Sequence, residues 1–247
     1  MEFVKMEGLG NDFVVLTGPV EPTASQVTAW CDRRRGIGAD GVLVVTPGDP
    51  VSMEYFNADG SAAEMCGNGL RCVALFAVLR EMVGERRFVV RTAVGDRWVE
   101  VDEDSVRVEV GPFGVDPAPL ELAGYGLTRV GVGNPHAVAF VADCATVPVA
   151  AAGPLVETDP RFPSGTNVGF ASVLDSDTIA LRVWERGVGE TLACGTGAVA
   201  AVAAASASGL TSERVTVILP GGSLLVELLE GVAWIEGPAR VVFAGAI

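Results

Sequence analysis

The sequence predicts an α+β fold of two pseudo-symmetric domains, each a strand-rich sheet or barrel wrapped around a central buried helix. Three observations lead to this prediction. Four short motifs occur twice in the same order, most other segments are β-branched or alternate between apolar and polar residues, and each half holds one long apolar segment after a Cys-Gly-x-Gly motif. Single glycine motifs recur by chance, but an ordered set of four indicates a duplicated unit.

The duplication sets the expected domain boundaries. The matched positions are Asn11 and Asn134, Asp40 and Asn167, Asn57 and Glu185, and Cys66 and Cys194. The first domain is therefore expected at residues 1–113 and the second at residues 114–238. The seam is expected near residues 111–120, where glycine and proline cluster.

Each half is expected to contain one buried helix that begins after its cysteine motif. The predicted ranges are 68–83, ending before Gly84, and 196–208, ending before Gly209. Both segments are apolar or small on nearly all faces, which indicates burial. A shorter outer helix is expected near residues 23–33, and the arginines at 33–35 are interpreted as its solvated end.

Strands are expected where short apolar runs are β-branched or alternate with polar residues. In the first half they are predicted at residues 42–45, 53–56, 88–92, 98–101 and 106–110. In the second half they are predicted at residues 130–132, 137–141, 178–184, 215–219, 223–229 and 241–244.

Composition excludes several classes of function. The formal net charge of −14 disfavours nucleic acid as a partner, because an acidic surface repels phosphate. Lys5 is the only lysine and His136 the only histidine, so only Lys5 could form a pyridoxal-phosphate Schiff base and no site can use several histidines. Because the five cysteines lack zinc-binding spacing, we expect no metal, and we also expect no organic cofactor.

The chain has no segment typical of a signal peptide or a membrane span. Its N-terminus lacks a basic start followed by an apolar run, and the stretch 198–209 is too short and too weakly apolar to span a bilayer. A cytoplasmic protein without a membrane partner is expected.

Cys66 and Cys194 each directly precede a predicted buried helix. N–H groups at a helix N-terminus bind anions such as a carboxylate, and the same location makes a nearby thiol more acidic. If the two halves face each other, one sulfur lies on each face of the carbon next to a bound carboxylate. One thiolate would then remove a proton while the other thiol delivers one from the opposite side, which inverts the configuration.

Other roles for these cysteines remain open at this point. Most cysteines are small buried hydrophobes, and this explains Cys31, Cys72 and Cys144. The matched context of Cys66 and Cys194 favours catalysis over packing. The alternatives are a redox pair that closes a disulfide across the cleft and a binding or redox-sensing module without enzymatic activity.

The longer motifs resemble those of the diaminopimelate epimerase family. The matching segments are residues 8–13, 36–41, 56–60, 65–72, 133–136, 167–170 and 184–198. The resemblance implies that family's fold, with the C-terminal segment 239–247 returning to the first domain, and a homodimer. It also implies a cofactor-independent epimerase that interconverts LL- and meso-2,6-diaminopimelate in lysine and peptidoglycan precursor synthesis.

The resemblance further implies which residues form the site around this small diamino diacid. It makes Cys66 and Cys194 the acid/base pair, with His136 and Glu185 orienting and tuning the thiols. The implied contacts to the reacting end are Asn11, Gly67, Asn68, Gly195 and Thr196. The implied contacts to the distal end are Asn57, Asn134, Asn167, Glu185 and Arg186, the last of which can bind a carboxylate with two parallel hydrogen bonds.

Structural roles would also explain several of these residues. Asn11 and Asn134 could satisfy turns, Asn57 could be a hairpin turn residue, Arg186 could form a surface ion pair, and His136 could be structural.

Two comparisons within the resemblance bear on the substrate. Proline and hydroxyproline epimerases form the nearest rival class, and they typically carry histidine where this chain has Asn68. Some family members have glutamine where this chain has Gly41, so a contact from that side chain is lost. Thr196 keeps the hydroxyl that several relatives present on a serine.

Overall fold

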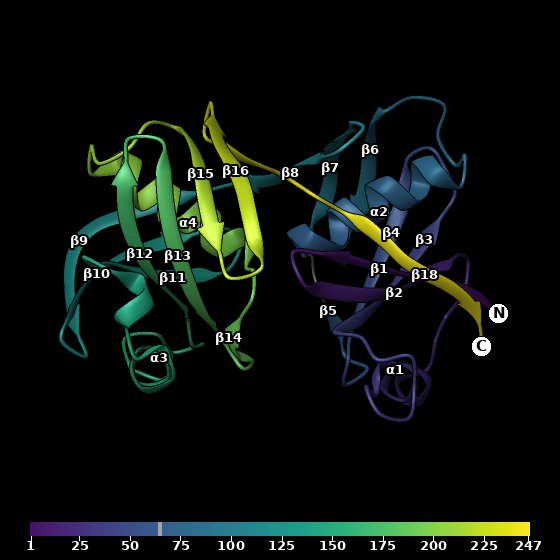
Figure 1. The fold of residues 1–247 in the computed structure, drawn as a ribbon, viewed down its shortest axis with the longest axis horizontal. Helices are drawn as coiled ribbons and strands as arrows, with labels where there is room; N and C mark the ends of the chain where they lie inside the picture. The colour runs from purple at the N-terminus through teal and green to yellow at the C-terminus, as the bar shows by residue number, and fades with distance from the viewer. Residues whose placement is uncertain (64–65) are drawn as a thin grey trace. The chain divides into compact units, whose positions relative to one another are not determined.

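Each of the two cysteine motifs leads into a helix that is surrounded by strands in the computed structural model, which describes residues 1–63 and 66–247 (Figure 1). Glu64 and Met65, the second of which begins the motif at 65–72, lie outside the described residues. The chain divides into two compact units, one formed by Met1–Val108 with Gly237–Ile247 and the other by Glu109–Glu236.

The described residues of the first unit form two α-helices and a larger number of strands. Its elements are β1 Glu2–Gly8, β2 Asn11–Thr17, α1 Ala24–Cys31, β3 Gly41–Thr46, β4 Val51–Asn57, β5 Ala62–Ala63, α2 Gly67–Leu79, β6 Arg87–Thr92, β7 Gly95–Val101 and β18 Arg240–Ala246, and β8 Val106–Pro112 begins in it. Helix α2 packs against β1, β2, β3, β4 and β7, and its side chains Leu70, Val73 and Phe76 are almost completely buried. Strand β18 pairs antiparallel with β1 and lies along it in Figure 1.

The second unit repeats this arrangement around α4. Its elements are β9 Gly114–Leu122, β10 Tyr125–Gly131, β11 Pro135–Phe140, a 3₁₀ helix at Cys144–Thr146, α3 Val149–Glu157, β12 Asn167–Asp175, β13 Thr178–Glu185, β14 Gly189–Thr191, α4 Gly195–Ala207, β15 Arg214–Leu219, β16 Gly222–Leu229 and β17 Val232–Gly237. Strands β9 to β13, β15 and β16 contact α4. The predicted α+β class, with strands around a buried helix in each unit, is confirmed.

Among the described residues, each unit contains a parallel strand pair that is joined through an outer helix. In the first unit β2 runs parallel to β3, with Phe13 beside Gly41. In the second unit β11 runs parallel to β12, with His136 beside Asn167. Parallel neighbours bring equivalent strand ends together, so residues just before β3 lie beside the start of β2.

Both buried helices are followed by a residue in the left-handed conformation, but only one of these residues is a glycine. After α4, Gly209 adopts a φ of 68° and Leu210 donates its N–H to the Ala205 carbonyl at 2.9 Å, as expected. After α2, Glu81 takes the left-handed conformation with a φ of 54°. The helix therefore ends at Leu79, and the predicted extension to residue 83 is wrong because the chain turns before Gly84.

The glycine- and proline-rich stretch predicted as the seam forms strand. It lies in β8 and in β9, which pairs with β10 except near Pro117 and Pro119, where the register shifts. Proline lacks the N–H that a ladder needs, so it is accommodated at such an irregularity. Elsewhere the short helix predicted at 23–33 forms α1, which Thr23 and Gln26 start with a capping box.

Of the helices that the structure describes, none is long and apolar enough to cross a membrane.

Candidate active site

Cys66 is the N-cap residue of α2 and is only partly exposed. Its Sγ lies 3.4 Å from Oδ1 of Asn11, which begins β2, and the same oxygen lies 3.3 Å from Nδ2 of Asn68. Gly67 and Asn68 form the first turn of the helix, whose N–H groups carry partial positive charge. The first unit therefore brings together four of its five predicted site residues, Asn11, Cys66, Gly67 and Asn68.

The fifth predicted residue of the first unit, Asn57, lies in a hairpin turn. Its N–H donates to the Ser61 carbonyl at 2.9 Å and its Nδ2 donates to Ser61 Oγ at 3.0 Å. These bonds are those of a turn residue, which was the structural alternative. A contact between Asn57 and a ligand stays a prediction.

Arg71 is a buried cation beneath the first turn of α2, and the sequence analysis missed it. Its guanidinium donates to Asn68 Oδ1 at 3.0 Å, to the Pro238 carbonyl at 3.3 Å and to the Gly67 carbonyl at 3.4 Å. Burial lowers the pKa of Arg71. The available signal was a charged residue within an otherwise apolar helix, and the structure gives it the role of holding Asn68 in place.

Cys194 is the N-cap residue of α4 and is buried, with 5% of its surface exposed. Its Sγ lies 3.4 Å from the N–H of Gly197, which donates to it, and 3.6 Å from the hydroxyl of Thr196. Burial raises the pKa of Cys194 well above its usual value, and the negative charge of Glu185 raises it further. The bonds from Thr196 and Gly197 lower it but do not compensate.

The expectation that a helix start makes the thiol more acidic is therefore wrong for Cys194 in this state. The helix supplies a donor to the sulfur, but removing the thiolate from water costs more than that donor returns. Glu185 also accepts a hydrogen bond from the Thr191 hydroxyl, which fixes its carboxylate beside the thiol.

The remaining predicted residues of the second unit gather at the parallel strand pair. Asn167 Oδ1 accepts the N–H of Arg186 at 3.0 Å, and Asn167 Nδ2 donates to the Pro135 carbonyl at 3.1 Å. His136 Nε2 lies 2.9 Å from Asn134 Oδ1. Asn134, His136, Asn167 and Arg186 thus form one cluster, and Arg186 directly follows Glu185.

The Arg186 side chain lies over Gly165. Gly165 has a φ of 71°, which side chains rarely adopt, and a Cβ there would come within 2.9 Å of Arg186 Cδ, so a substitution would be strained and would displace the Arg186 side chain. Arg186 Nη1 donates to the Ser164 carbonyl at 2.9 Å.

His136 is neutral at physiological pH. It is 2% exposed, and burial together with the positive charge of Arg186 lowers the pKa of His136 to about 3. A neutral imidazole that faces an amide oxygen carries its proton on that nitrogen, so Nε2 donates to Asn134 Oδ1. His136 therefore positions Asn134 and supplies no positive charge to a thiolate.

This buried histidine makes the fold sensitive to acid. The unfolded chain binds the proton at the ordinary pKa of 6.5 and the folded chain at about 3. The neutral, buried imidazole therefore contributes its full stabilisation above pH 6.5. As the pH falls from 6.5 to about 3, the free energy of unfolding decreases by up to about 5 kcal/mol. We expect the free energy of unfolding, measured with urea between pH 7 and pH 4, to fall less steeply in His136→Gln than in the unsubstituted chain. Parallel curves would contradict the assignment, because carboxylates contribute equally to both proteins.

Gly41 is glycine because its surroundings leave no room. A Cβ there would lie 2.5 Å from the Phe56 carbonyl oxygen and 2.6 Å from Cε2 of Tyr55. The Tyr55 ring occupies the space that a side chain at position 41 would need, in agreement with leaving this position out of the site.

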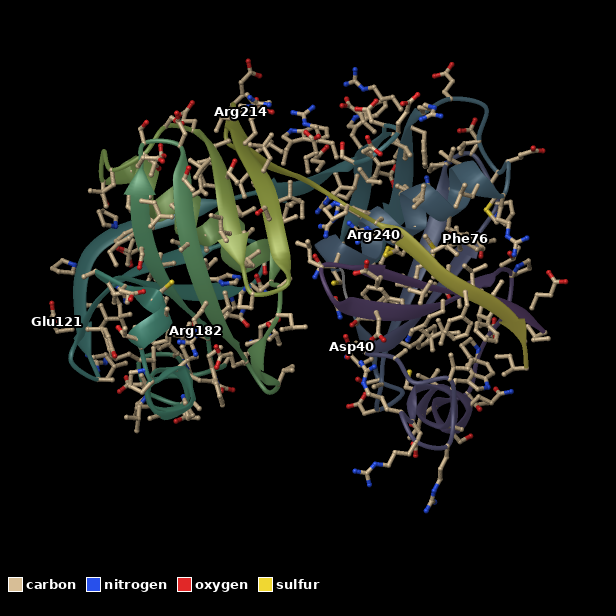
Figure 2. The ribbon with its side chains drawn as sticks, viewed as in Figure 1. Asp40, Phe76, Glu121, Arg182, Arg214 and Arg240 are labelled. Atoms are coloured by element: carbon tan, nitrogen blue, oxygen red, sulfur yellow. The ribbon has the colours of Figure 1, made fainter. Side chains whose placement is uncertain are left out.

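A second group that the sequence analysis missed lies beside Asn11. Arg33 was interpreted as part of a solvated helix end, and its side chain is 57% exposed, but Nη2 lies 2.6 Å from Asp40 Oδ1 and 2.7 Å from Asp12 Oδ1. Asp40 is labelled in Figure 2, between β2 and α1 in that view. The parallel pairing of β2 with β3 brings Asp12 beside Asp40 and Arg33, which lie in the segment between α1 and β3. No local motif reveals this pairing.

Comparison with known proteins agrees with the resemblance. The profile of the diaminopimelate epimerase family matches residues 3–114 and 128–242. The diaminopimelate epimerase of Pelotomaculum thermopropionicum is 45% identical over 99% of this chain and 98% of its own length. The diaminopimelate epimerase of Thioalkalivibrio sulfidiphilus is 44% identical over 100% of this chain and 99% of its own length.

Solved structures share the fold at much lower identity. A probable proline racemase from Agrobacterium radiobacter K84 superimposes with a TM-score of 0.74 at 16% identity, covering 100% of this chain and 92% of that one. A hydroxyproline epimerase from Agrobacterium vitis gives 0.75 at 16%, covering 99% and 91%. Proline and hydroxyproline epimerases were the nearest rival class. These two structures are 16% identical to this chain, whereas the two diaminopimelate epimerases are 44–45% identical to it. The chain belongs to the diaminopimelate epimerase family.

Proposed function

We propose that this chain interconverts LL- and meso-2,6-diaminopimelate with two cysteines, in lysine and peptidoglycan precursor synthesis. The observation that carries the proposal is that Cys66 and Cys194 are N-cap residues of the two buried helices of a duplicated fold. A thiolate at one position takes the α-proton and becomes a thiol. The thiol at the other position gives its proton to the opposite face of the carbanion and becomes a thiolate.

The helix starts supply the remaining chemistry in this proposal. Negative charge that develops on the α-carboxylate is stabilised by preorganised N–H groups, here those of Gly67, Asn68, Gly195 and Thr196. Asn11 contacts the reacting end beside Cys66, whose sulfur lies 3.4 Å from its oxygen.

The distal end of the substrate is assigned to the cluster of the second unit and to Asn57. Arg186, held over Gly165, is a bidentate partner for the distal carboxylate. Asn134 and Asn167 provide amide oxygens that suit an ammonium group. Glu185 tunes the Cys194 thiol, and His136 acts by holding Asn134.

The test follows the α-proton. The reduced protein is incubated with LL-diaminopimelate in heavy water, and the products are analysed by NMR and chiral chromatography. The proposal expects the meso isomer with deuterium at one α-carbon. Binding without exchange would indicate a binding module, and exchange into proline or trans-4-hydroxyproline in parallel incubations would indicate the rival class.

The family resemblance also carries a proposal about assembly and location. We propose that the chain works as a homodimer in the cytoplasm. We expect sedimentation velocity at micromolar protein concentration to give twice the mass of one chain. The mass of a single chain would contradict the dimer.

A further inference from the structure

An ionic network lies on the Nδ2 side of the Asn11 amide. Asp40 Oδ2 accepts hydrogen bonds from Asn11 Nδ2 at 2.8 Å and from the N–H of Asp12 at 3.1 Å. Asp40 in turn donates its own N–H to Asp12 Oδ1 at 3.1 Å. The parallel pairing of β2 with β3 sets these contacts, because it places Asp40 beside the start of β2 (Figure 2).

Two cations hold the carboxylates of this network. Arg33 Nη2 bridges Asp40 Oδ1 and Asp12 Oδ1, and its Nη1 donates to Asp12 Oδ2 at 3.0 Å. Lys5 is 5% exposed, lies 2.7 Å from Asp12 Oδ2 and donates to the Gly38 carbonyl. Burial raises the pKa of Asp12, but the bonds from Arg33 and Lys5 outweigh it and lower that pKa to about 2. The only lysine of the chain is thus part of this network.

The network decides which end of the Asn11 amide faces Cys66. A carboxylate that pairs with a guanidinium only accepts hydrogen bonds, so the NH₂ group of Asn11 must face Asp40. Its oxygen then faces Cys66 Sγ at 3.4 Å and Asn68 Nδ2 at 3.3 Å. If the Asn11 amide were turned over, its oxygen would face the Asp40 carboxylate and its NH₂ group would face the NH₂ group of Asn68. Both contacts would be unfavourable.

We propose that Asp40, held by Arg33, is a positioning residue that fixes the oxygen of Asn11 toward Cys66 and so favours Cys66 as a proton-bearing thiol. The proposal deepens the proposed function, on which it rests for the part that Cys66 plays in proton transfer. A thiol can donate to an amide oxygen and a thiolate cannot, so this orientation favours the protonated form. The family resemblance assigned no role to Asp40, Arg33, Asp12 or Lys5.

The duplicated unit supports a positioning role for this residue. The position that matches Asp40 is Asn167, which lies at the start of β12 in the parallel pair of β11 with β12. Asn167 accepts a hydrogen bond from the N–H of Arg186 and donates one to the Pro135 carbonyl. The same place in the fold therefore orders site residues in both units, with a charged side chain in one and a neutral one in the other.

The test replaces the acceptor by a nearly isosteric amide. In Asp40→Asn the new side chain can present its own NH₂ group to Asn11, so the Asn11 amide can turn over and offer a donor to the sulfur. We expect iodoacetamide to alkylate Cys66 about 3- to 10-fold faster at pH 7, the change that one hydrogen bond typically produces. The pH profile of alkylation, read by mass spectrometry of the Cys66 peptide, should shift to lower pH.

Other charged or titratable groups around Cys66 stay the same in this comparison. Among the described residues these groups include Arg71 and Cys72, which interact electrostatically with Cys66, and Glu7, which interacts with both of them. In the epimerase assay we expect kcat to fall about tenfold in the direction in which Cys66 donates the proton, since its thiol is then less often protonated and less well oriented. Asp40→Glu keeps an acceptor-only group and should restore part of kcat and of the alkylation profile.

The matched control is Asp96→Asn, which breaks the ion pair between Arg91 and Asp96 in the same unit. It should leave both readouts unchanged. If Asp40→Asn does not fold by circular dichroism, Arg33→Gln releases the Asp40 carboxylate and should shift the profile in the same direction. An unchanged alkylation profile in a folded Asp40→Asn or Arg33→Gln protein would overturn the inference. The alkylation readout needs no substrate, so failure of the unsubstituted protein to epimerise diaminopimelate would instead count against the proposed function.

Discussion

Cys66→Ala and Cys194→Ala are each expected to abolish epimerisation, with kcat lower by at least about 10³-fold. In the proposed mechanism each substitution removes one of two groups that act in the same turnover, and such general acid or base groups contribute about 10²–10⁴-fold each. The remaining thiol can still remove a proton from its own face of the α-carbon and return deuterium to that face. Each variant should therefore exchange deuterium into only one of the two isomers, and the two variants should be complementary.

Cys144→Ala is the control for these variants. Cys144 is buried and lies in the second unit, at the start of the 3₁₀ helix. Its loss should leave kcat and the exchange of both isomers unchanged. Exchange of both isomers by Cys66→Ala or by Cys194→Ala would contradict two-sided proton transfer, because a single sulfur would then reach both faces.

The sequence predicted the parts of the fold that local chemistry decides. The two cysteines lie at the N-cap positions of their helices, and Gly209 ends α4, because helix starts and left-handed turns depend on a few adjacent residues. The end of α2 was wrong since Glu81 took a conformation for which glycine is the usual signal. Helix α3 and seven strands were not predicted, namely β1, β2, β5, β9, β12, β14 and β17. Two of these strands pair with a partner that is distant in sequence, β1 with β18 and β12 with β11.

In the candidate site, too, the sequence predicted what adjacent residues decide and missed what distant residues decide. The positions of Asn11, Cys66 and Asn68 followed from the repeated motifs, and the structure brings them within hydrogen-bond distance. The environment of each group did not follow from motifs. Burial reversed the expected acidity of Cys194, and the register of β2 with β3 brought Asp40 and Arg33 to Asp12, which is distant in sequence.

Arg71→Ala is expected to lower the free energy of unfolding by about 3–5 kcal/mol. Arg71 is fully buried, so the substitution leaves a cavity where the side chain packed. It also leaves oxygens of Gly67, Asn68 and Pro238 without the guanidinium that donates hydrogen bonds to them. Because Pro238 precedes β18, hydrogen exchange should accelerate in β1 and β18 as well as in the first turn of α2.

Two further variants separate the contributions of charge and packing. Arg71→Met keeps most of the buried stem and removes a cation whose burial is itself unfavourable, as its lowered pKa indicates, so its cost should be about half as large. Arg80→Ala, at the exposed end of the same helix, loses a contact between the guanidinium and the Phe76 ring and should cost less than about 1 kcal/mol. Urea unfolding measures all three variants. If Arg71→Ala costs no more than Arg80→Ala, the three hydrogen bonds do not stabilise the helix start, and Asn68 must be held beside Cys66 by packing alone.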